Sequence, residues 1–127
     1  WKKGNRLAHR SGPVGGVGEV FAAVNMTDPT RTDYFVENVE LDPNRRRTIK
    51  LTSTDGVLVG FASFVLEEAN GATKVGYHVY SETVIPPARL KATTLEALRD
   101  SERAIRESSA RRFHEELLAL KALAEGR

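Results

Sequence analysis

The sequence predicts an α+β fold in which an antiparallel β-sheet of five to six strands precedes, and packs against, one long C-terminal α-helix. Two observations predict it. Short stretches of alternating apolar and polar residues fill the first two thirds of the chain, separated by turn-forming Gly, Pro, Asn and Asp. After Pro87 there is no further Pro, and no Gly before Gly126, in a stretch rich in Ala, Leu, Glu, Arg and Lys, which favour helices. Strands followed by a helix are typical of the α+β class.

The strands are expected in succession, each joined to the next by a short turn. Consecutive strands joined in this way are antiparallel neighbours, so the sheet should be a meander. Asp55-Gly56 is the clearest hairpin turn in the chain. The expected strands are 7–9, 17–26, 33–41, 45–54, 57–68 and 73–84.

Alternation along these strands predicts one apolar face, and the apolar residues of the C-terminal stretch recur at helical spacing. The sheet is expected to place these residues toward the helix: Phe35, Val39, Leu41, Ile49, Leu51, Phe64, Leu66, Val75, Tyr77 and Val79. The helix is expected to oppose them with Leu98, Ile105, Phe113 and Leu117.

The helix should run from about residue 87 to 125. Pro87 suits the first helical position, and Gly126 suits the position just past the end. A later start is the alternative, because Thr93 with Glu96 fits a capping box. The earlier start is favoured since no helix breaker follows Pro87.

Bulk properties exclude several classes of protein. A chain of 127 residues is expected to form a single domain. The net charge of +2 gives no reason to expect nucleic acid as a partner, and no apolar run approaches the length of a membrane span, so no membrane insertion is expected. There is no Cys, which excludes disulfides, and a cytoplasmic location is the default expectation.

The order of several short motifs resembles the SRPBCC (START-like) superfamily, and within it the polyketide cyclase/dehydrase-like group. These motifs are Val39–Arg46 (VELDPNRR), Phe64–Glu67 (FVLE), Asn70–Val75 (NGATKV) and Leu117–Glu125 (LLALKALAE), the last with the group's Leu-x-x-Leu-Lys-x-x-x-Glu pattern. The resemblance implies a helix-grip fold, in which a curved antiparallel sheet wraps around the long C-terminal helix. It also implies that the chain binds a hydrophobic small molecule in a cavity between the sheet and this helix. The alternative is a non-enzymatic lipid carrier or a protein-interaction module of the co-chaperone kind, so whether the chain is an enzyme stays open.

The resemblance also carries an expectation about the N-terminus. In the family, a strand and two short helices precede the position of Trp1. The chain is therefore expected to be N-terminally truncated, with an open sheet edge that favours a homodimer.

By the resemblance, the expected site is an apolar cavity with few polar groups. The alternative is that the same residues form a packed core, which is favoured for the helix residues, whereas a cavity is favoured for the centre of the sheet. Glu19, Asn25, Glu37 and Tyr77 are the candidates to orient a ligand, although a surface position for Glu37 is favoured because ionised carboxylates are seldom buried. The three His residues are too scattered for a metal site, no cofactor is expected, and no catalytic residue is assigned. Arg45–Arg47 is interpreted as a solvated hairpin end. The expected ligand-binding residues are Phe35, Glu37, Val39, Leu51, Phe64, Leu66, Tyr77, Leu98 and Ile105.

Overall fold

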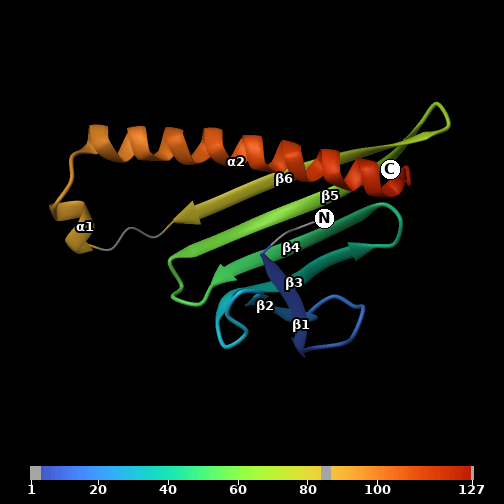
Figure 1. The fold of residues 1–127 in the computed structure, drawn as a ribbon, viewed down its shortest axis with the longest axis horizontal. Coiled ribbons are helices and arrows are strands. Elements are labelled where there is room, and N and C mark those ends of the chain that lie inside the picture. The colour runs from blue at the N-terminus through green and yellow to red at the C-terminus, as the bar shows by residue number, and fades with distance from the viewer. Residues whose placement is uncertain (1–3, 84–86, 127) are drawn as a thin grey trace. The chain divides into compact units, whose positions relative to one another are not determined.

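The computed structural model describes residues 4–83 and 87–126 of the chain (Figure 1). They fall into two units, a sheet in residues 4–83 and a helical segment in residues 87–126. Trp1, the position that a strand and two short helices precede in the family, lies outside the described residues.

The first unit is a six-stranded antiparallel sheet. Its strands follow one another in chain order, so that every neighbour in the sheet is also a neighbour in sequence (Figure 1). The predicted meander is therefore confirmed, with six strands. Their bounds are β1 (Asn5–Ser11), β2 (Val20–Asn25), β3 (Thr32–Asp42), β4 (Arg46–Ser53), β5 (Leu58–Ala69) and β6 (Ala72–Thr83).

The hairpin turns form where the sequence predicts them. Asn44 and Asn70 adopt positive φ angles of 62° and 52°, which Asn tolerates better than most residues. In the β4–β5 turn, Asp55 Oδ1 accepts hydrogen bonds from the Val57 N–H at 3.0 Å and from the Ser53 hydroxyl at 2.5 Å. These local bonds fix the turn, and with it the register of the two strands that it joins.

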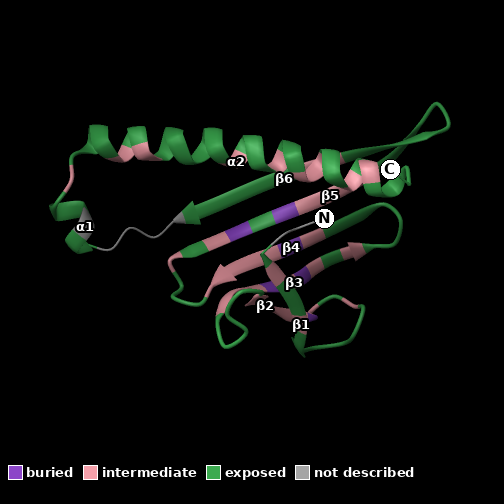
Figure 2. Ribbon diagram, in the orientation of Figure 1, coloured by how far each residue is buried: buried purple, intermediate pink, exposed green. Residues whose placement is uncertain are grey.

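One face of the sheet, called here the core face, holds the buried residues. Val36, Ile49 and Ala62 are 3%, 8% and 2% exposed and lie on three adjacent strands, where Figure 2 shows the buried positions. Direct cross-strand partners point to the same face, and Ile49 pairs with Ala62. The half-buried side chains packed against these three are Phe21, Tyr34, Leu51 and Tyr77.

The register of β3 corrects the prediction for two residues. Val36 pairs with Leu51, and Phe35 pairs with Thr52, so Phe35 and Glu37 lie on the face opposite the core face. The expectation that Phe35 shares a face with Leu51 is wrong, whereas for Glu37 the register agrees with the favoured alternative, in which this residue does not face the core. The reason is a β-bulge, because Val39 is an extra residue between two successive ladder pairs. If Val39 is counted as an ordinary strand residue, the alternation that leads back from Leu41 assigns Phe35 and Glu37 to the wrong face.

The second unit holds two helices, α1 (Pro87–Lys91) and α2 (Leu95–Ala124). The expectation of one continuous helix from about residue 87 is wrong in its first part, whereas the long C-terminal helix itself is confirmed. A second helix begins after Thr94, whose hydroxyl accepts a hydrogen bond from the Ala97 N–H at 3.2 Å and caps α2. At the other end Gly126 takes a φ of 70°, as predicted for the residue that follows a helix.

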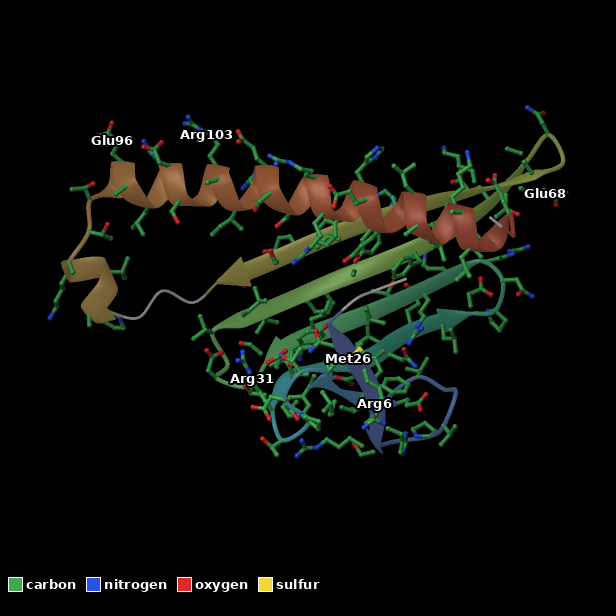
Figure 3. The ribbon with its side chains drawn as sticks, in the orientation of Figure 1. Arg6, Met26, Arg31, Glu68, Glu96 and Arg103 are labelled. Carbon is green, nitrogen blue, oxygen red and sulfur yellow. The ribbon has the colours of Figure 1, made fainter. Side chains whose placement is uncertain are left out.

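Helix α2 is amphipathic, but none of its residues is buried. Leu98 and Phe113 are half-buried, while Ile105 on the same apolar stripe is 60% exposed. Glu96 and Arg103, which are seven residues apart, point to a common side of the helix (Figure 3). Neither α1 nor α2, the helices of the described ranges, is long and apolar enough to cross a bilayer.

We expect Ile49→Ala to lower the free energy of unfolding by about 2–4 kcal/mol, because it removes a buried side chain from the centre of the core face. Urea denaturation measures the change. Lys74→Ala is the control, since its exposed pair with Glu67 (3.4 Å) should contribute less than about 1 kcal/mol. Equal losses in the two variants would show that the core cluster is misassigned.

Asp33 joins three strands and should make stability depend on pH. Its Oδ2 accepts hydrogen bonds from the side-chain amides of Asn5 (2.8 Å) and Asn25 (3.1 Å), and its Oδ1 lies 2.6 Å from Arg31 Nε. The Asn5 bond, followed by the Asn25 bond and the Arg31 charge, lowers the pKa of Asp33 below its ordinary value of 3.8. A lowered pKa in the folded state stabilises the fold above the unfolded-state pKa, and this contribution is lost as pH falls through the folded-state pKa.

We therefore expect Asp33→Asn to be less stable than wild type at pH 7, with a difference that shrinks as the pH falls below about 3.8. Urea midpoints measured across this range test the expectation, with Glu68→Gln, an exposed residue of β5, as the control. A difference that stays constant with pH would contradict it.

Candidate functional site

The core face of the sheet is the candidate site, and several of its buried residues are small. Ala23, Gly60 and Ala62 are all buried there, so their own side chains occupy little volume above the sheet. Gly60 pairs with Leu51, and Ala62 with Ile49. Large rings surround these positions, namely Phe21, Tyr34, Phe64 and Tyr77.

A band of apolar side chains continues along β5 and β6. Phe64 and Tyr77 are direct cross-strand partners whose rings stack, with 4.4 Å between centroids and 18° between planes. Leu66 and Val75 form the next pair on the same face and are 38% and 37% exposed, and Val79, beside Ala62, is 41% exposed. The core face therefore presents accessible apolar surface as well as a buried cluster.

The first polar group on this face is a carboxylate–imidazole pair. Glu19 is only 4% exposed, its Oε1 lies 3.1 Å from His9 Nδ1, and its Oε2 accepts a hydrogen bond from the Gly15 N–H at 2.7 Å. The imidazole lies edge-on to Phe21, its partner in the register, at 6.4 Å.

The second polar group is an amide–guanidinium pair. Asn38 is 4% exposed, and its Oδ1 accepts hydrogen bonds from Arg47 Nε at 3.0 Å and from Arg47 Nη2 at 2.8 Å. The amide nitrogen donates to the Gly16 carbonyl at 3.3 Å. Arg47 pairs in the register with Leu41 and with Phe64, so it lies on the core face next to the ring stack.

The structure divides the expected ligand-binding residues among four places. It brings Leu51, Phe64, Leu66 and Tyr77 together on the core face, as expected. It places Phe35 and Glu37 on the opposite face, where Arg10 lies 4.6 Å from the centre of the Phe35 ring. Val39 is the bulge residue, and Leu98 and Ile105 belong to α2.

Two of the four candidate polar residues have other roles. Asn25 Oδ1 accepts hydrogen bonds from the Thr27 and Asp28 N–H groups, which makes Asn25 part of a turn. Glu37 lies on the opposite face, as described above. Glu19 and Tyr77 remain on or beside the apolar cluster.

Sequence reasoning missed His9, Asn38 and Arg47. Arg47 stands two residues before Ile49, so simple alternation along β4 places it on the core face. The interpretation of the three consecutive arginines as a solvated hairpin end overlooks this. That interpretation suits Arg46, which lies 3.6 Å from Glu40 on the other face. Asn38 is missed because the bulge beside it reverses the alternation that would assign its face.

Two hollows of the sheet unit, of about 310 and 240 Å³, lie toward hairpin ends. Charged side chains such as Arg45 and Glu67 line them, together with Leu66, so the hollows differ from the apolar centre of the core face. Within residues 4–83 and 87–126, no three His, Asp or Glu side chains come together in a way that would hold a metal ion.

Comparison of the chain with protein-family models, with curated proteins and with solved structures finds no match. The SRPBCC resemblance therefore rests on the order of short motifs alone.

The loop between β1 and β2 is fastened to the core face by Glu19 and Asn38, and one of its glycines is sterically required. A Cβ on Gly12, whose φ is +84°, would lie 2.1 Å from the Gly18 carbonyl oxygen. Gly15 has a φ of +72°, and a Cβ there would meet nothing within 4 Å. A substitution at Gly15 therefore introduces backbone strain alone, whereas the same substitution at Gly12 introduces strain and a steric clash.

We expect Gly15→Ala to cost about 1–2 kcal/mol through its left-handed conformation alone, and Gly12→Ala to cost more because the loop must also move. Thermal unfolding of the two variants compares them. If both lose the same stability, the close approach between Gly12 and Gly18 does not constrain the loop.

Proposed function

We propose that the chain binds a hydrophobic small molecule against the core face of its sheet, in the manner of the polyketide cyclase/dehydrase-like members of the SRPBCC superfamily that its sequence resembles. The observation that carries the proposal is the composition of that face. Its buried apolar residues are small or of medium size, namely Ala23, Val36, Ile49, Gly60 and Ala62, whereas the aromatic residues and Leu51 around them stay partly exposed. No large side chain of the described residues is fully buried.

This distribution favours a binding surface over a filled core. In a packed core, large apolar side chains are almost completely buried and interdigitate with few voids. Apolar sites with a few convergent polar groups are typical of small-molecule binding, and the core face adds Glu19, His9, Asn38 and Arg47 to its apolar residues.

A neutral fluorescent probe tests the proposal. We expect Nile red to bind wild-type protein saturably, with a micromolar Kd. Val79→Lys should weaken binding at least about fivefold, because it places an ammonium group on the accessible part of the core face. Fluorescence titration measures both affinities.

The control is the neighbouring residue. Tyr80 is 59% exposed and points to the opposite face, so Tyr80→Lys should leave Nile red binding unchanged. Absence of saturable binding to folded wild-type protein would overturn the proposed function, and equal losses in the two variants would place the probe elsewhere.

A further inference from the structure

We propose that Arg47, held by the buried amide of Asn38, binds the carboxylate of an apolar ligand whose aromatic body lies along the Phe64–Tyr77 stack. This inference rests on the proposed function and deepens it, since it names the chemical class of the ligand: an aromatic or otherwise apolar monocarboxylic acid.

The first argument is the charge balance on the core face. Among the residues that the structure describes, no carboxylate lies within 4.0 Å of the Arg47 guanidinium, whose hydrogen bonds go to the neutral oxygen of Asn38. Arg46, its neighbour in sequence, points the other way and has a carboxylate partner in Glu40. A positive charge next to apolar groups, without an acidic partner in the sheet, is complementary to an anion.

The second argument is the way in which the guanidinium is held. Asn38 is almost completely buried, and its oxygen receives both Nε and Nη2 of Arg47, while its amide nitrogen is anchored to the Gly16 carbonyl. A buried amide used in this way fixes the plane of the guanidinium and leaves the remaining N–H donors, on Nη1 and Nη2, directed away from Asn38. Arginine prefers planar, two-oxygen acceptors, and a carboxylate fits this requirement.

The third argument is what lies beside the charge. Arg47, Phe64 and Tyr77 occupy one row across β4, β5 and β6, because Arg47 pairs with Phe64 and Phe64 pairs with Tyr77. A ligand that reaches Arg47 with its carboxylate can therefore place its apolar part along this row, against the accessible part of the half-buried Phe64 and Tyr77 rings. Stacking geometry and charge pairing together favour a flat aromatic acid.

The experiment compares two probes with the same ring system, the anionic naphthalene-carboxylate and the neutral naphthalene-methanol, by calorimetric titration at pH 7. Wild-type protein should bind the carboxylate roughly tenfold more tightly or better, in the range expected for a charge-assisted bidentate contact. Arg47→Gln should remove this preference without abolishing binding of the alcohol. Arg46→Gln is the matched control and should retain the preference.

A second variant keeps the test decisive if Arg47→Gln fails to fold. Asn38→Asp places a carboxylate against the same guanidinium and should also remove the preference, because Arg47 then has an internal partner. A preference that survives both Arg47→Gln and Asn38→Asp overturns the inference. So does equal binding of the two probes by wild type, and in that case the proposed function still stands. Failure of both probes to bind overturns the proposed function together with the inference.

Discussion

The bulge at Val39 is the constraint on which the rest of the sheet depends. Strand β3 is paired on both sides, and its first half presents Val36 and Asn38 to the core face, while after the bulge Leu41 takes that role. Side chains alternate along a strand, so a single extra residue exchanges the two faces. Without the bulge, the residues on one side of it would be turned from the core face, and either Val36 or Leu41 would lie on the opposite face.

The sheet combines extensive backbone pairing with modest burial. Five antiparallel ladders connect its six strands, but its buried apolar residues are few, namely Ala23, Val36, Ile49 and Ala62. Register is strongly specified only where one face is buried, and here the small central cluster supplies that specification. The large residues toward β5 and β6 are then available for contacts other than those of a core, which is the physical basis for assigning a binding role to this face.

The sequence was sufficient for the strands and their order, because Gly, Asn, Asp and Pro mark the turns and alternation marks the strands between them. It was insufficient for the faces of β3, since no residue type identifies a bulge at Val39 in advance. It also indicated a continuous helix where Thr94 interrupts it, because a side-chain cap competes locally with helix propensity and the outcome depends on small energies. The apolar part of the site at Leu51, Phe64, Leu66 and Tyr77 follows from alternation alone, whereas the polar pairs around Glu19 and Asn38 depend on contacts between distant residues.

Asn38 has a consequence for how this protein can vary. Its side chain joins the loop at Gly16 to the guanidinium of Arg47, and its backbone pairs with both Gly18 and Glu19. Losing either side-chain partner would leave a buried polar atom unsatisfied, which typically costs about 1–3 kcal/mol. The loop, the amide and the arginine are therefore energetically coupled, so that the effects of substitutions in them should not add. We expect tolerated substitutions in this group to occur as compensating pairs, whereas the exposed arginines around it can be substituted singly.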